Sequence, residues 1–172
     1  PGIKDTAVLN KAFAAMSILL QQAWQGRASN LPYANAYQAL IVASLIEKET
    51  AIESETPVVA GVIVRRLQKK MYLQVDPTVI YGLGDAYKGA LTRSDLRKKT
   101  PYNTYRKKGL PPTPICMPSA SAIYAALHPA AGDALYYVAK GDGSHVFSAT
   151  LREHNQAVRR YILDEGKGEH ER

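Results

Sequence analysis

Hydrophobic positions recur at helical spacing through the first part of the chain. Apolar side chains three and four residues apart predict a helix over residues 5–24, with Asp5 or Thr6 as its cap. A second helix is expected to start at Asn35 and to reach about residue 54, and a third follows Pro57. The first part of the chain is therefore expected to be helical.

Strand-like alternation is strongest near the other end of the chain. Residues 135–139 predict a strand, a glycine-rich turn follows, and residues 145–148 pair back to form a hairpin. Shorter elements are expected at residues 72–75 (strand), 76–81 (helix), 92–95 (helical turn), 119–127 (helix) and 150–162 (helix). Residues 100–118 hold five prolines and predict an irregular segment. Helices first and a small antiparallel β element late indicate the α+β class, mainly helical.

One apolar run ends abruptly in charged residues. It reads LIVASLIEKET over residues 40–50, and Glu47 is the first carboxylate in it. On a helix, Glu47 shares a stripe with the small side chains of Ala43, Ser44 and Ala51. A carboxyl on such a stripe lies at the edge of a core or on the floor of a cleft, where desolvation raises its pKa, as a general acid needs. The alternative is that Glu47 is simply the first solvated residue of the helix.

Length and charge limit the classes of protein to consider. The 172 residues, 46% hydrophobic and 22% charged, fit one soluble globular domain. The net charge of +7 includes basic clusters at residues 65–70, 97–99 and 106–108, which suggest a polyanionic partner: nucleic acid, an acidic membrane surface or a wall polymer. The alternative is that each cluster is a solvated face. Cys116 is the only cysteine, so the chain can form no intrachain disulfide.

Several motif classes are absent from the sequence. It has no P-loop, no dinucleotide fingerprint, no HExxH and no histidine spacing typical of a metal site, and its serines lack the nucleophile-elbow context. No metal and no cofactor are therefore expected. Acid–base chemistry by one carboxylate is better supported, with Glu47 as the best-placed candidate. A hydrolytic glycosidase needs a second carboxylate, and Asp76, in Asp-Pro-Thr, fits a helix cap better.

A set of ordered motifs then resembles one known family, the YceG-like endolytic murein transglycosylases (the MltG family). The matching blocks are ASLIEKET at residues 43–50, LQVDPTVIYG at 73–82, YNTY at 102–105, GLPP at 109–112 and HVF at 145–147. His128-Pro129 and His154-Asn155 match as well. The resemblance covers roughly residues 40–162. Val75 and Cys116 match less well than their neighbours.

The resemblance implies a reaction and a set of site residues. The reaction is non-hydrolytic cleavage of the MurNAc-β-1,4-GlcNAc bond within peptidoglycan strands, in which the muramoyl 6-hydroxyl attacks its own anomeric carbon and leaves a 1,6-anhydroMurNAc end. Glu47 is expected to act as acid and then as base, with Glu49 as its rival in the same motif. The residues expected to bind substrate are Ser44, Gln74, Asn103, Thr104 and Tyr105. The residues expected to support the site are Glu49, Asp76 and His145.

The resemblance also implies how the chain is organised. Residues 1–172 would be a single catalytic domain: a leading helix and turn (about 1–35), a catalytic core (36–163) whose late hairpin helps to form a substrate cleft, and a frayed tail (164–172). The chain begins at Pro1, has no span of about 18 apolar residues, and would be a soluble excised piece that lacks an N-terminal membrane anchor and a LysM-like subdomain.

The full-length protein would act at the periplasmic face of the bacterial cytoplasmic membrane, on glycan strands, with peptidoglycan synthases (penicillin-binding proteins) as partners. The second hypothesis is a non-catalytic peptidoglycan-binding module of a cell-wall synthesis complex. A basic nucleic-acid binder rests on charge alone and lacks any recognisable motif, so no nucleic-acid partner is expected.

Overall fold

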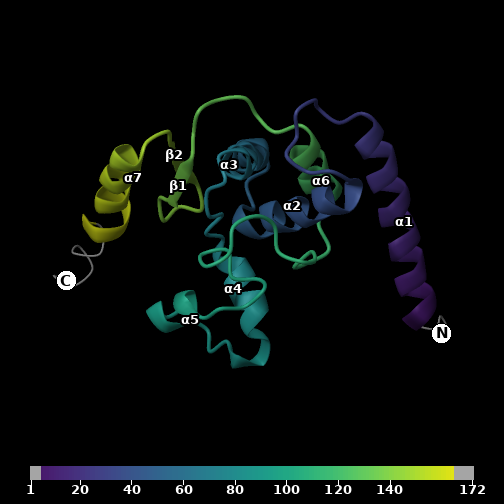
Figure 1. The fold of residues 1–172 in the computed structure, drawn as a ribbon, viewed down its shortest axis with the longest axis horizontal. Coiled ribbons are helices and arrows are strands. Elements are labelled where there is room, and N and C mark those ends of the chain that lie inside the picture. Colours follow the sequence, from purple (N-terminus) through teal and green to yellow (C-terminus); the bar gives the residue numbers. More distant parts are fainter. Residues whose placement is uncertain (1–4, 165–172) are drawn as a thin grey trace.

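Residues 5–164 are described by a computed structural model (Figure 1). The helices are α1 (Asp5–Gln25), α2 (Ala36–Glu49), α3 (Thr56–Gln68), α4 (Asp76–Leu83), α5 (Arg93–Arg97), α6 (Ala120–Leu127) and α7 (Leu151–Val158). Short 3₁₀ turns cover Glu53–Glu55 and Gly84–Ala86, and a π-helical turn covers Arg159–Asp164. Strands β1 (Tyr136–Ala139) and β2 (His145–Ser148) form an antiparallel pair. The expected mainly helical α+β class is confirmed. Most of the expected tail lies outside the described residues.

The centre of the fold is α2, which packs against α3 and α6 (Figure 1). Every side chain from Ile41 to Ile46 is buried, so the middle of α2 is enclosed on all sides. Small residues of α6, such as Ala122 and Ala126, let the two helices approach closely, and Ile63 of α3 closes the core from another side. A helix enclosed in this way has a fixed position, and so do the residues at its end.

Capping sets where α2 begins and ends. Asn35 is the N-cap, as its sequence context predicts, and its side chain accepts a hydrogen bond from Gln38 N–H. At the other end Thr50 is extended, with φ −144°, so the helix stops at Glu49. The prediction that the helix continues to about residue 54 is wrong, because the chain leaves the helix at Thr50 and forms a separate 3₁₀ turn before α3.

Helix α1 lies at one side of the molecule, beside α6 (Figure 1). Its second half, including Leu20 and Trp24, packs against the core. Its first half exposes Val8, Leu9 and Phe13. The predicted amphipathic helix is present, although none of its side chains is fully buried.

Two other sequence predictions fail locally. Residues 72–75 were expected to form a strand, but they run without a sheet partner and their backbone is bonded by Arg66 and Thr104 instead. Asp76 was expected to cap a helix, but it is the first residue of α4 and its side chain makes no capping bond. Its carboxyl is therefore free to face elsewhere.

Candidate active site

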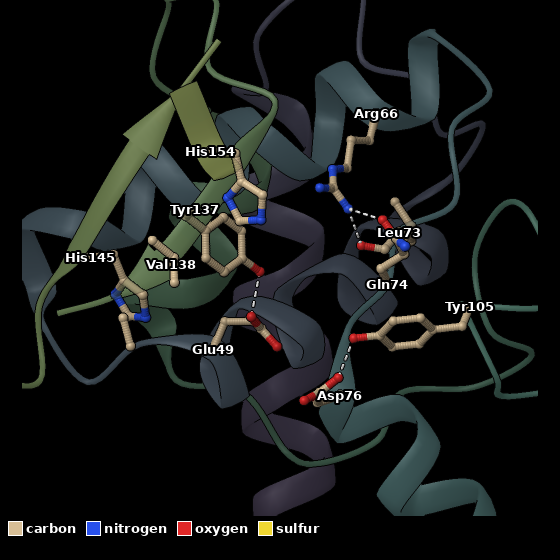
Figure 2. Close-up of a pocket in the computed structure, with 11 residues that line it drawn as sticks. Glu49, Arg66, Leu73, Gln74, Asp76, Tyr105, Tyr137, Val138, His145 and His154 are labelled. Atoms are coloured by element: carbon tan, nitrogen blue, oxygen red, sulfur yellow. Dashed lines mark hydrogen bonds between the residues drawn. The ribbon is translucent and has the colours of Figure 1, made fainter. Parts of the chain in front are cut away.

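A cavity of about 480 Å³ opens where the C-terminal ends of α2 and α3 meet the hairpin and the start of α4 (Figure 2). The residues that line it are Glu49, Arg66, Leu73, Gln74, Asp76, Tyr105, Tyr137, Val138, Ala139, His145 and His154. Two carboxylates, a guanidinium, two phenols and two imidazoles thus border the same space. Such a concentration of titratable groups in a concave site is typical of an active site.

Glu49 occupies this cavity from the last position of α2. The Tyr137 hydroxyl donates a hydrogen bond to Glu49 Oε2 from strand β1 (Figure 2). Burial raises the pKa of Glu49 and the charge of Asp76 adds to the effect, whereas the Tyr137 hydrogen bond and the charges of His145 and Arg66 oppose it. The C-terminal end of a helix also disfavours a carboxylate. Glu49 therefore holds its proton more tightly than an ordinary glutamate.

Asp76 lines the same cavity as Glu49 and is paired with Tyr105. The Tyr105 hydroxyl donates a hydrogen bond to Asp76 Oδ1 (Figure 2). Burial and the adjacent Asp76 raise the pKa of Tyr105, so this phenol stays a donor. Asp76 sits in the first turn of α4, where the helix dipole favours negative charge. The two carboxyl groups of the cavity thus occupy contrasting environments, one at the end of a helix and one at the start.

Arg66 ties three segments of the wall together. Its guanidinium donates to the carbonyl oxygens of Leu73 (2.7 Å) and Leu135 (2.6 Å), and to Gln74 Oε1 (3.4 Å). Only 8% of the residue is exposed, and the guanidinium lies 5.2 Å from the centre of the Tyr136 ring. The planar fork of arginine suits such a set of acceptors. Arg66 therefore fixes the spacing between α3, the segment before α4 and the start of the hairpin.

Gln74 adopts an unusual backbone conformation in the wall. Its φ is +55°, a left-handed value that residues other than glycine rarely adopt. Its N–H donates to the Thr104 carbonyl at 3.2 Å, and its side-chain oxygen accepts from Arg66. With that oxygen occupied, the amide NH₂ is the group that can donate to a ligand. Gln74 lines the cavity, and its expected contact with substrate stays a prediction.

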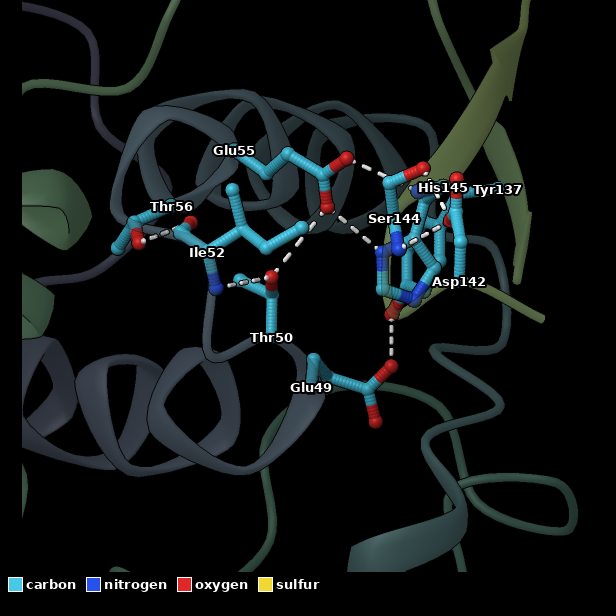
Figure 3. Close-up of polar contacts among 9 residues, drawn as sticks. All are labelled: Glu49, Thr50, Ile52, Glu55, Thr56, Tyr137, Asp142, Ser144 and His145. Carbon is cyan, nitrogen blue, oxygen red and sulfur yellow. Dashed lines mark hydrogen bonds and ion pairs between the residues drawn. The ribbon is translucent and has the colours of Figure 1, made fainter. Parts of the chain in front are cut away.

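His145 is held by Glu55 at the far end of the cavity (Figure 3). Glu55 accepts hydrogen bonds from His145 N–H (2.9 Å) and from its ring Nδ1 (2.7 Å). Burial alone would raise the pKa of Glu55, but the bonds and charge of His145 hold it below its ordinary value. The imidazole meets the Tyr137 ring edge-on, with centroids 5.6 Å apart. The Glu55–His145 pair thus joins the hairpin to the connection between α2 and α3.

Three residues expected to bind substrate are buried instead. Ser44 is 0% exposed, and its hydroxyl accepts a hydrogen bond from Ile115 N–H. Asn103 donates to carbonyl oxygens around the end of α5 and accepts from Tyr105 N–H. Thr104 Oγ1 accepts from a backbone N–H of the segment before α4. Their predicted place in the lining of a cleft is wrong: they hold loops in position, and Asn103 orients Tyr105.

Glu47 leaves α2 away from this cavity. Its Oε2 accepts hydrogen bonds from Ser119 N–H (2.9 Å) and Oγ (2.7 Å), at the start of α6, beside a smaller hollow of about 220 Å³. These bonds lower the pKa of Glu47, and its side chain is exposed. The predicted desolvated environment with a raised pKa is wrong, because the stripe of small residues leads to α6 and not to the main cavity.

Comparison with known proteins identifies the family. The sequence profile of the YceG-like family matches residues 1–160. The chain belongs to the YceG-like family. It is 44% identical over 128 residues to an endolytic murein transglycosylase of Bacillus subtilis, covering 74% of this chain and 35% of that protein. It is 32% identical over 130 residues to one of Streptococcus pneumoniae, covering 73% and 24%.

A solved structure of the family agrees in fold. A crystal structure of a yceG-like protein from Listeria monocytogenes superposes with a TM-score of 0.66 at 43% identity, covering 70% of this chain and 39% of that one. The resemblance inferred from the motifs is confirmed. The chain spans about a third or less of the length of the curated relatives it matches.

Sequence reasoning missed several residues of this YceG-like site. The sequence places Tyr137 in an expected strand and Arg66 in a basic cluster. Glu55 lies between two expected helices, and no local pattern indicates its contact with the hairpin. A signal for Arg66 was available, since it follows an apolar stretch of α3 and lies on its buried face. Tyr137 and Glu55 reach the site through contacts across 88 and 90 residues, which no local pattern reveals.

Within residues 5–164, no three His, Cys, Asp or Glu side chains are grouped so that they could hold a metal ion. Over the same residues, the structure contains no helix with the length and apolar character needed to cross a bilayer.

Proposed function

We propose that this domain is an endolytic peptidoglycan lytic transglycosylase in which Glu49, and not Glu47, is the acid and then the base. The observation that carries the proposal is the position of Glu49: a carboxyl with a raised pKa, bonded by Tyr137, in the cavity that gathers the titratable groups. The printed names of the relatives supply the substrate class, murein.

In the first step the Glu49 carboxyl gives its proton to the glycosidic oxygen. The bond between that oxygen and the anomeric carbon of MurNAc breaks, and GlcNAc leaves with a 4-hydroxyl. The sugar left behind is an oxocarbenium-like species. A raised pKa favours this step because it keeps the acid protonated before the bond breaks.

In the second step the Glu49 carboxylate takes the proton of the muramoyl 6-hydroxyl. That oxygen attacks its own anomeric carbon and closes the 1,6-anhydro ring, so no water is consumed. The nucleophile is part of the substrate, which gives it the proximity of an intramolecular reaction. The Tyr137 hydroxyl stabilises the carboxylate between the two steps by donating to Glu49 Oε2.

Other residues of the cavity stabilise positive charge and hold the sugar. Asp76, already bonded by Tyr105, supplies negative charge to the cavity in which the oxocarbenium-like centre forms. The NH₂ of Gln74 can donate to an N-acetyl carbonyl or a hydroxyl. Glu49, Asp76, Gln74 and Tyr105 are thus our assigned contacts with substrate, while Arg66, Tyr137 and His145 position them.

A hydrolase is the competing enzyme class, because the cavity contains a second carboxyl group. Asp76 could in principle activate a water for an inverting or retaining hydrolysis. We favour the internal nucleophile because Asp76 already accepts the Tyr105 hydrogen bond and because the relatives are named transglycosylases. The products of the two reactions differ by one water at the new MurNAc end, whereas the new GlcNAc end carries a 4-hydroxyl in both.

Mass spectrometry of released fragments tests the proposal. Wild-type chain, Glu49→Gln and Glu47→Gln would each be incubated with purified peptidoglycan. We expect anhydro ends from the wild type, a loss of at least about 100-fold in Glu49→Gln, and near wild-type rates in Glu47→Gln, with circular dichroism unchanged in both. Rapid cleavage by Glu49→Gln, or loss of activity only in Glu47→Gln, would reject Glu49. Glycan binding without any new ends in the wild type would instead support the non-catalytic module.

The proposal extends to domain limits, location and partners. We assign residues 36–163 as the catalytic core, the periplasmic face of the cytoplasmic membrane as the site of action, and peptidoglycan synthases as partners. Support for these points is the resemblance to the family. Co-purification of full-length protein with penicillin-binding proteins from solubilised membranes tests the partnership, and an empty eluate under conditions that retain the bait would reject it.

A further inference from the structure

A second hollow, of about 610 Å³, lies beside the N-terminal half of α2. Its walls come from the start of α2, from Leu67 at the end of α3, and from the turn at residues 109–112. Tyr37, which is 50% exposed, borders it with Asn35 and Gln38. None of the ten described residues that line it carries a charge, in a chain whose net charge is +7.

The same segments of the chain contribute different residues to this hollow and to the Glu49 cavity. Neighbouring residues of α3, Arg66 and Leu67, each line one of them. Tyr105 lines the cavity, and Gly109, four residues later in the same segment, lines the hollow. Figure 1 shows that this coil, between α5 and α6, passes across α2.

Helix α2 connects the two spaces most directly. Gln38 in the hollow and Glu49 in the cavity are eleven residues apart. At about 1.5 Å and 100° per residue, they lie about 16 Å apart along the axis and only about 20° apart around it. Gln38 and Glu49 therefore lie on the same side of the helix, with the buried turns of α2 between them.

We propose that the second hollow binds sugar residues of the same glycan strand, at a distance from the bond that is cut. This inference rests on the proposed function. Because its lining residues carry no charge, the hollow suits the neutral sugar backbone and not the carboxylates of stem peptides. The exposed ring of Tyr37 offers a face on which a pyranose can stack.

The amide side chains fit the same ligand. Asn35 Oδ1 accepts from Gln38 N–H at 3.0 Å, and Gln38 Oε1 accepts from Ala34 N–H at 2.8 Å. Both amide oxygens are thus in use, which leaves two NH₂ groups as donors for N-acetyl carbonyls and hydroxyls. Pro111 and Pro112 form a stiff opposite wall that loses little freedom when a ligand binds.

The consequence is a preference for long strands. A short glycan can fill only the Glu49 cavity, whereas a long strand gains contacts in both spaces and is held with an interior bond at Glu49. The hollow would thus make the cut endolytic by binding energy remote from the reaction.

The test compares Tyr37→Ala with two controls. Tyr37→Phe keeps the ring face, and Tyr124→Ala removes another exposed tyrosine, on α6, that lines neither space. We expect Tyr37→Ala to raise KM about tenfold on long uncross-linked strands, equivalent to about 1.4 kcal/mol, with kcat unchanged and with no effect on a tetrasaccharide. Both controls should behave as wild type. Equal effects on long and short substrates, or none on either, would overturn the subsite.

Binding measurements separate this inference from the proposed function. Calorimetry with Glu49→Gln protein measures affinity for long strands without any cleavage. Adding Tyr37→Ala to that protein should weaken binding about tenfold on long strands only. If the wild type forms no anhydro ends but this difference appears, the proposed reaction fails and the subsite stands. If cleavage occurs and the difference is absent, the reverse holds.

Discussion

Glu47 and Glu49 lie two residues apart in α2, yet their side chains point about 200° apart around its axis. Glu47 meets Ser119 at the start of α6, and Glu49 meets Tyr137 in strand β1. The pKa of the first is lowered by two hydrogen bonds, and the pKa of the second is raised by burial. One motif thus carries a carboxylate that anchors a helix and a carboxyl suited to proton transfer.

The raised pKa of Glu49 makes stability depend on pH. The folded protein binds this proton more tightly than the unfolded chain, whose glutamate pKa is about 4.3. Ionisation of Glu49 therefore does not lower the stability of the folded protein below that pH, and lowers it increasingly as the pH rises towards the folded pKa. We expect the free energy of unfolding of Glu49→Gln to exceed that of the wild type by an amount that grows as the pH rises through this window. The excess is about 1.4 kcal/mol for each pH unit by which folding raises the pKa of Glu49. Urea titrations between pH 4 and pH 8 measure it; a constant difference would contradict the assignment.

Asp76→Asn should move the activity profile of the enzyme to lower pH. The negative charge of Asp76 raises the pKa of Glu49, so an uncharged amide allows Glu49 to lose its proton earlier. We expect the alkaline limb of kcat/KM to move down by less than about one pH unit, with a lower kcat because the oxocarbenium-like centre loses a negative neighbour. Asn can still accept from Tyr105, so the wall should remain. An unchanged limb would remove Asp76 from the environment of Glu49.

Tyr137→Phe should move the same limb in the opposite direction. Its hydroxyl stabilises the Glu49 carboxylate, and its loss raises the pKa further while it slows the second step. A hydrogen bond to a charged group is worth about 1.5–3 kcal/mol, so kcat should fall about tenfold or more. Tyr124→Phe on the exposed face of α6 is the matched control. Movement of the limb to lower pH would mean that Tyr137 does not act as a donor to Glu49.

Glu55→Gln should loosen the hairpin without removing any catalytic group. The substitution weakens the bonds to His145 N–H and Nδ1, both in a part-buried setting. We expect a loss of about 1–2 kcal/mol in unfolding free energy and faster amide exchange across residues 145–148. Glu53→Gln, an exposed neighbour in the same 3₁₀ turn, is the control. Equal exchange in the two variants would show that the pair does not hold β2.

Arg66→Lys should be far from conservative. A lysine cannot reproduce the fork that reaches the carbonyl oxygens of Leu73 and Leu135, so buried acceptors are left unsatisfied at a cost of about 1–3 kcal/mol each. We expect a loss of at least about 2 kcal/mol in unfolding free energy, with reduced activity because Gln74 loses its partner. Arg97→Lys, on the exposed end of α5, should change neither. Denaturant titration and the fragment assay provide the two readouts, and wild-type values would contradict this role.

The elements were largely predictable from sequence because their signals are local. The Asn35 cap, the capping box of Thr92 and Asp95, and the alternation at residues 135–139 each give the element that forms there. Residues 72–75 alternate in the same way but find no partner strand, since Arg66 takes their carbonyl oxygens. Local pattern gives the propensity of a segment, and tertiary contacts decide whether a strand can pair.

The sequence reveals the family motif but not how the side chains around it are arranged. Because α2 is buried on every side from Ile41 to Ile46, its apolar pattern does not show which side faces a cavity. That side is set by Tyr137 and His145, which approach from the hairpin. The polar character of YNTY likewise suggested sugar contacts, whereas Asn103 and Thr104 use their polar groups on backbone. Only Tyr105 of that tetrad lines the cavity.

The enclosed middle of α2 makes residue number, as well as residue type, a determinant of function. One residue inserted between Ile46 and Glu49 would turn the carboxyl by about 100° and advance it by about 1.5 Å, away from Tyr137. Because the side chains from Ile41 to Ile46 are buried in the core, the helix could not rotate to bring the carboxyl back to Tyr137. Homologous chains should therefore tolerate substitutions within this stretch far better than insertions or deletions, and a glutamate moved by one position should not restore activity.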